Sequence, residues 1–134
     1  MIFEFQVRTT EREQFVDVTP LVRQALAESG VEGDGVITVF APHTTAAVTI
    51  NENTDPAVPR DILTTLDRLA PYRGDYDHAE GNSDAHIKSS LIGASSRVLF
   101  NGGQLLLGPW QGIFFAEFDG PRTRQLVVHV GGTR

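Results

Sequence analysis

The sequence contains no cysteine, and this absence excludes disulfide bonds, thiol nucleophiles and zinc–thiolate sites. It also lacks any run of about 18 apolar residues, so no segment is expected to span a membrane. The first ten residues, MIFEFQVRTT, have neither the basic start nor the long apolar core of a secretion signal. A cytoplasmic location is the default prediction, because neither a secretion signal nor a membrane span is visible. The lack of cysteine is by itself compatible with any compartment.

Positive charge is scarce. The chain has 11 Lys and Arg against 17 Asp and Glu, which gives a formal net charge of −6. A protein that binds a nucleic-acid backbone needs a basic face, so nucleic acid is not an expected partner. A small anionic ligand remains compatible with this composition if the few cations converge in one place.

What is present fits one globular domain, residues 1–134, with 40% hydrophobic and 21% charged residues. Alternation of Phe3, Phe5 and Val7 with polar residues predicts a half-buried strand near the start. Apolar runs predict further strands at 35–41, 46–51, 96–101, 104–108, 110–118 and 124–130.

Helices are expected at three places. One has Thr19 as N-cap and ends at Gly30, and a second follows Asp55-Pro56 and ends before Pro71. A short third helix begins near Ala85 and ends at Gly93. Two or three helices among mostly late, antiparallel strands predict an α+β fold, a largely antiparallel β-sandwich.

Residues 71–85 show no apolar period, and a long structureless stretch inside a compact domain is often functional. His78 lies in this stretch, His86 follows it, and His43 lies at the turn between two expected strands. Imidazole is the commonest metal-binding side chain, and a metal site needs about three protein ligands. The three histidines therefore predict a zinc or iron site, and acid–base catalysis by one of them is the competing interpretation.

A second group of polar residues follows the expected strand 46–51: Asn51, Glu52, Asn53 and Asp55. Asp55 is expected to cap the next helix, whereas Glu52 is a candidate catalytic acid or base. Glu117 shares a largely apolar strand face, so its carboxylate needs a cation, a metal or a shared proton.

Candidate anion ligands lie in two segments. A helix start near Ala85 would place Lys88, Ser89 and Ser90 in its first turn, and DGPRTR adds Arg122 and Arg124. Trp110 and Gln111 would form a wall for a planar ring, although core packing explains Trp110 equally well.

Three segments, HTTAAVTINENTDP, YDHAEGNSDAHIKSSLIGAS and WQGIFFAEFDGPRTR, are similar to the signature blocks of the YjbQ family, small proteins often labelled secondary thiamine-phosphate synthase. The resemblance implies an α+β homotrimer with a polar pocket near the subunit boundaries. It also implies recurrent polar residues at His43, Thr44, Asn51, Glu52, Asn53, Asp55, His78, Gly81, His86, Lys88, Ser89, Ser90, Trp110, Gln111, Gly112, Glu117 and Arg124.

The activity that this resemblance implies joins a pyrimidine diphosphate to a thiazole phosphate and releases pyrophosphate. On that interpretation magnesium is held by Glu52, Asp55 or Glu117, phosphate oxygens bind Lys88, Ser89, Ser90 and Arg124, and the ring stacks on Trp110. Two alternatives stay open. One is a histidine-liganded metal-dependent hydrolase with Glu52 as base, and the other is a non-catalytic trimer that binds a small anionic metabolite.

Overall fold

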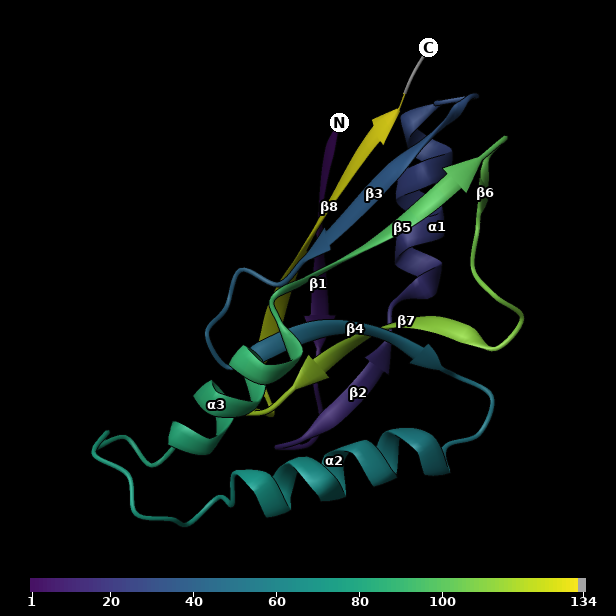
Figure 1. Ribbon diagram of the computed structural model, residues 1–134. Coiled ribbons are helices and arrows are strands. Elements are labelled where there is room, and N and C mark those ends of the chain that lie inside the picture. Colours follow the sequence, from purple (N-terminus) through teal and green to yellow (C-terminus); the bar gives the residue numbers. More distant parts are fainter. Residues whose placement is uncertain (133–134) are drawn as a thin grey trace.

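The computed structural model describes residues 1–132, so the last two residues of the predicted domain lie outside the described part. A five-stranded sheet has the order β1 (Ile2–Arg8), β8 (Thr123–Gly132), β3 (Asp34–Phe40), β5 (Ser95–Asn101) and β6 (Gln104–Leu105). A three-stranded sheet has the order β2 (Gln14–Asp17), β7 (Gln111–Glu117) and β4 (Ala46–Glu52). Neighbouring strands run antiparallel in both sheets, which confirms the predicted α+β class (Figure 1).

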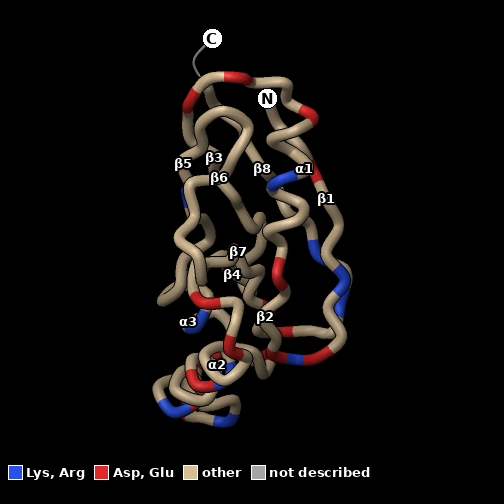
Figure 2. The backbone as a smooth tube through the Cα atoms, turned by 90° about the vertical axis from the view of Figure 1, so that its right-hand side faces the viewer, with Lys and Arg blue, Asp and Glu red and all other residues tan. Residues whose placement is uncertain are grey.

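The three-stranded sheet lies between two groups of packed side chains. On one side, α1 (Thr19–Ser29) and the five-stranded sheet enclose the main core, which includes Val22, Leu26, Ile37, Phe115 and Leu126. On the other side, α2 (Ala57–Leu69) and α3 (Ser83–Ile92) close a smaller core around Leu66, Ala85, Ala116 and Phe118. Charged residues of both signs gather around α2, α3 and the end of β2 (Figure 2).

The first helix starts one residue earlier than its sequence signal indicated. Thr19 is the first helical residue instead of the N-cap, and the carboxylate of Asp17 accepts its N–H at 2.9 Å. The Thr19 hydroxyl accepts the backbone N–H of Ile113 at 2.8 Å, which ties α1 to β7. The side chain is therefore used for a tertiary contact and not for capping.

The third helix also starts earlier than predicted, at Ser83 and not near Ala85. Lys88, Ser89 and Ser90 consequently lie in the second turn, so the expectation that they flank free N–H groups of the first turn is wrong. Helix α2 begins at Ala57, where Asp55 accepts the backbone N–H at 2.9 Å, and Pro59 falls within its first turn.

Two strands differ from the sequence prediction. β2 was not predicted, because its four residues are too few to show a period. β6 contains only Gln104 and Leu105, so the predicted strand 104–108 is shorter than expected. No helix in residues 1–132 is long and apolar enough to cross a membrane.

Candidate functional site

A pocket of about 450 Å³ lies where three distant segments meet. The β3–β4 loop supplies one wall, the segment that leads into α3 supplies a second, and the β7–β8 turn supplies a third. We call this the His43 pocket. Its lining residues are Pro42, His43, Thr44, Thr45, Glu80, Asn82, His86, Asp119, Arg122 and Arg124.

One lining residue, Arg124, belongs to a buried ion pair between β7 and β8. Glu117 and Arg124 are both almost completely buried, and Nε of Arg124 donates to the two carboxylate oxygens at 2.8 and 3.1 Å. Nη2 of Arg124 also donates to Glu117 and, at 2.8 Å, to Oγ1 of Thr45. Burial alone would raise the pKa of Glu117, but the hydrogen bonds from Arg124, from the Asp119 N–H and from Thr9 hold it below its ordinary value.

His43 is fixed by the backbone of β8. Its Nε2 lies 3.0 Å from the amide nitrogen of Gln125 and 3.1 Å from the carbonyl oxygen of that residue. The edge of the ring packs against Phe115, with 6.3 Å between ring centroids. Burial, reinforced by the positive charge of Arg124, lowers the pKa of His43, which favours the neutral imidazole at neutral pH.

The segment that leads into α3 meets the β7–β8 turn through Asn82, Asp119 and Arg122. Nδ2 of Asn82 donates to Asp119 at 2.9 Å, and Asp119 also lies 3.2 Å from Nη2 of Arg122. Oδ1 of Asn82 is buried and has no hydrogen-bond partner among residues 1–132. About half of the Arg122 side chain is exposed, so its guanidinium is accessible to a ligand.

The predicted histidine ligands are only partly brought together. His78 and His86 lie edge to face with 5.3 Å between ring centroids, while His43 and His86 line the same pocket. Within the described residues, however, no group of three or more His, Cys, Asp or Glu side chains is placed to hold a metal ion. A single chain thus does not present the predicted three-histidine donor set, and zinc or iron binding stays a prediction.

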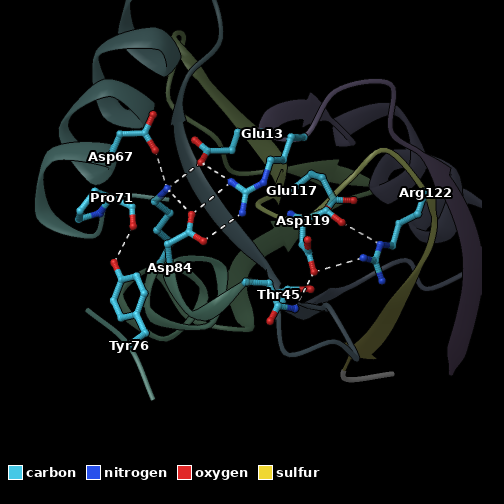
Figure 3. A network of polar contacts seen from close by, with 12 residues as sticks. Glu13, Thr45, Asp67, Pro71, Tyr76, Asp84, Glu117, Asp119 and Arg122 are labelled. Atoms are coloured by element: carbon cyan, nitrogen blue, oxygen red, sulfur yellow. Dashed lines mark hydrogen bonds and ion pairs between the residues drawn. The ribbon is translucent and has the colours of Figure 1, made fainter. Parts of the chain in front are cut away.

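Lys88 lies outside the pocket, in a buried network between α2, α3 and the β1–β2 loop. Its Nζ donates to Glu13 at 2.6 Å, to Asp67 at 2.5 Å and to Asp84 at 3.0 Å, and the side chain is 0% exposed. Figure 3 shows these three carboxylates converging on one point. Arg12 adds paired bonds of 3.0 and 3.2 Å to Asp84.

This Lys88 network leaves no ammonium group for a phosphate. Burial would lower the pKa of Lys88, but the hydrogen bonds that its ammonium group donates to the three carboxylates raise it, so the side chain is held charged. Ser89 and Ser90 donate to the backbone oxygens of Ala46 and His86. Among the predicted phosphate ligands, Thr44 and Arg124 line the His43 pocket.

The other predicted site residues lie at the far end of the three-stranded sheet. Glu52 pairs with Gln111 there, whereas Ala46 pairs with Glu117 beside the pocket. A seven-residue strand separates the two ends by about 20 Å. Residues at the far end are Asn51, Glu52, Asn53, Asp55, Trp110 and Gln111.

Several of these far-end residues have local structural contacts. Asn51 accepts the Glu52 N–H at 2.7 Å, and the Gln111 side chain accepts the Gly108 N–H at 2.8 Å. Asn53 donates to Asp17 at 3.2 Å, and its side chain fills the space beside Gly112, where a Cβ atom would lie 2.5 Å from it. Trp110 is 66% exposed, so it does not pack in the core.

The polar residues that sequence reasoning missed in or beside the pocket include Glu80, Asn82, Asp119 and Thr9. Glu80 and Asn82 lie between His78 and His86, so their position in that loop was a usable signal. Thr9 had no such signal. It donates to Glu117, which is 108 positions away in the sequence, at 2.8 Å.

A family model described as UPF0047 protein YjbQ-like matches residues 3–133. A UPF0047 protein of Methanocaldococcus jannaschii is 52% identical over 100% of this chain and 96% of its own length. YugU of Bacillus subtilis is 46% identical over 98% of this chain and 100% of its own length.

Two solved structures share the fold. One is a YjbQ/UPF0047-family protein from Clostridium acetobutylicum, with a TM-score of 0.94 and 54% identity over 96% of this chain and 99% of that one. The other, from Sulfolobus solfataricus, is described as a YbjQ-like protein of unknown function. It has a TM-score of 0.94 and 31% identity over 99% of this chain and 97% of that one.

Proposed function

We propose that this chain, which belongs to the UPF0047 family of YjbQ-like proteins, binds a small phosphorylated metabolite in the His43 pocket and transfers part of it to a second metabolite. The observation that carries this proposal is that Arg122 and Arg124, from the β7–β8 turn and the start of β8, meet His43, from the β3–β4 loop, around one pocket that is open to solvent. Guanidinium groups suit phosphate oxygens, because their donors are always charged and lie in one plane.

The acceptors in the pocket narrow the ligand class. Glu80 and Asp119 lie beside the arginines, and Oδ1 of Asn82 is an unpartnered acceptor in the described part of the chain. A plain phosphate ion would leave the buried Asn82 oxygen without a donor, which is costly for a buried group. The arrangement favours a metabolite that carries both a phosphoryl group and N–H donors, such as an amino-substituted heterocycle.

The reaction implied by the family resemblance fits this class. An aminopyrimidine diphosphate and a thiazole phosphate would be joined as the ring nitrogen of the thiazole forms a bond to the pyrimidine methylene carbon. The bond from that carbon to the diphosphate oxygen breaks, and pyrophosphate leaves with the electron pair. Arg122 would stabilise the charge that develops on the leaving group. Glu52 and Asp55 lie at the far end of the strand from Glu117, which is paired with Arg124, and magnesium binding by these carboxylates stays a prediction.

An assay of thiamine-phosphate formation from the two precursors, with and without magnesium, tests the reaction. Arg122→Ala is expected to lower kcat/KM at least about tenfold, because it removes a charged hydrogen-bond donor. Arg97→Ala is the matched control, since Arg97 is an exposed arginine on β5 and does not line the pocket. If no product forms while a phosphorylated precursor still binds, the transferase reaction is wrong and the chain is a binding protein.

A metal-dependent hydrolase is the second candidate, and the placement of His78 and His86 favours it. Ring centroids 5.3 Å apart fit two imidazoles on one zinc ion, with Zn–N bonds of about 2.0–2.1 Å. The third ligand would have to be His43 after a rearrangement or a group outside the described residues. About one metal ion per chain in untagged protein, lost in His78→Ala and His86→Ala, would support this candidate. Metal-free wild-type protein would refute it.

The homotrimeric assembly and the cytoplasmic location stay predictions. Sedimentation equilibrium of the untagged chain tests the first, and fractionation of cells that express the native protein tests the second. A monomer would also remove the implied pocket at a subunit boundary.

A further inference from the structure

Helix α3 has apolar side chains on two opposite faces. Ala85 and Ile92 pack inward in the smaller core, whereas Ile87 and Leu91 point outward and are 40% and 59% exposed. Ile87 and Leu91 are four residues apart and therefore neighbours on the helix surface. A surface helix ordinarily keeps its outward face polar, so this apolar outward face requires an explanation.

The outward face is continuous with the His43 pocket through one side chain. His86 lines the His43 pocket, and it also lines a hollow of about 410 Å³ shared with His78 and Ile87. It contributes again to a groove of about 300 Å³ formed with Ile87, Ser90 and Leu91. A ligand held at the arginines therefore reaches apolar surface by passing His86.

We infer that Ile87 and Leu91 form the apolar subsite of the metabolite bound in the His43 pocket, and that this metabolite carries a flat apolar ring next to its phosphoryl group. This inference rests on the proposed function. The pocket itself has little apolar lining, with Pro42 as its one aliphatic wall. Trp110, the residue predicted from sequence to contact a ring, lies at the far end of the sheet.

Two simple phosphate esters test the subsite by NMR titration of the full-length ¹⁵N-labelled chain. Methyl phosphate supplies the phosphoryl group alone, and 2-naphthyl phosphate adds a flat apolar ring. Wild-type protein is expected to bind the naphthyl ester about tenfold more tightly, which corresponds to burial of part of one ring face. The double variant Ile87→Ser/Leu91→Ser is expected to lose this preference while its affinity for methyl phosphate changes less than about twofold.

Leu99→Ser is the matched control, because Leu99 is 57% exposed on β5 and does not line these hollows. It is expected to keep the preference. Equal affinity of the wild type for both esters, or a preference retained by the double variant, overturns the subsite and leaves the proposed function intact. Failure of both esters to bind overturns the proposed function together with the subsite. A double variant that keeps the preference but changes its sedimentation mass would show that a second copy of the chain covers Ile87 and Leu91 instead.

Discussion

Replacing Lys88 by methionine is expected to destabilise the folded chain by about 3 kcal/mol, the lower end of the range for breaking a buried ion pair. Methionine has nearly the same length, so the change removes the charge and the donors while it keeps most of the packing. Arg12 still neutralises Asp84, and Asp67 is 52% exposed and can turn to water. Most of the cost therefore falls on Glu13, whose remaining cationic partner among residues 1–132 is Arg12, at 3.2 Å.

Urea denaturation followed by far-UV circular dichroism measures this cost. With a denaturant slope of about 2 kcal/mol per molar, a loss of 3 kcal/mol lowers the midpoint by about 1.5 M. Arg68→Met on α2 is the control, since Arg68 is exposed and its replacement is expected to change stability by less than about 0.5 kcal/mol. A midpoint for Lys88→Met within about 0.3 M of the control would refute the view that the Lys88 network stabilises the fold.

The stability cost of Lys88→Met is also expected to depend on pH. Burial already raises the pKa of Glu13 in the native chain, and loss of the ammonium group would raise it further. A carboxyl whose folded pKa is raised contributes stability at low pH and loses it as the pH rises through that pKa. The penalty of Lys88→Met is therefore expected to be smaller at pH 5 than at pH 7. An equal penalty at both values would mean that the buried charge of Glu13, left without Lys88, is not its cause.

Three further changes have defined outcomes. Glu117→Gln is expected to cost about 3 kcal/mol at pH 6 and much less at pH 3. The folded pKa of Glu117 is lowered, so the stability from its ionised form is present above the unfolded pKa of about 4.3 and is lost as the pH falls. Urea midpoints of the wild type and of Glu117→Gln at pH 6 and pH 3 measure this cost. The same cost at both pH values would contradict the view that ionised Glu117 stabilises the fold. Arg122→Gln is expected to weaken methyl phosphate binding about tenfold in the NMR titration, and unchanged binding would remove Arg122 from the site. Thr19→Val leaves the buried Ile113 N–H without its acceptor, at a cost of about 1–3 kcal/mol by urea denaturation, whereas Thr19→Ser is expected to cost little.

The parts of the fold that were predictable were those with a local signal. Alternation of Phe3, Phe5 and Val7 identified β1, and the apolar spacing up to Pro71 identified α2. β2 has four residues and no measurable period, so it could not be found that way. The start of α3 was misplaced because residues 80–84 contain no apolar side chain, so no apolar period marks the first helical turn.

The site residues that could be predicted were likewise those with a local signal in the sequence. A carboxylate on an apolar strand face indicated that Glu117 needs a cation, and Arg124 supplies it seven residues away. Lys88 was interpreted as an anion ligand because its partners Glu13 and Asp67 are 75 and 21 positions away. The separation of Trp110 from the pocket was foreseeable in principle, since Gln111 and Glu117 stand at opposite ends of one strand.

The burial of Lys88 has a practical consequence for chemical labelling, because Lys88 is the only lysine in the chain. Its amine is enclosed by three carboxylates and 0% exposed, so an acylating reagent reaches it only when the Lys88 network opens. The labelling rate of Lys88 under native conditions therefore reports the free energy of that local opening. Enzymes that acylate lysine side chains would find no exposed target on the folded chain, and a modified Lys88 recovered from cells would mark a molecule that had been open.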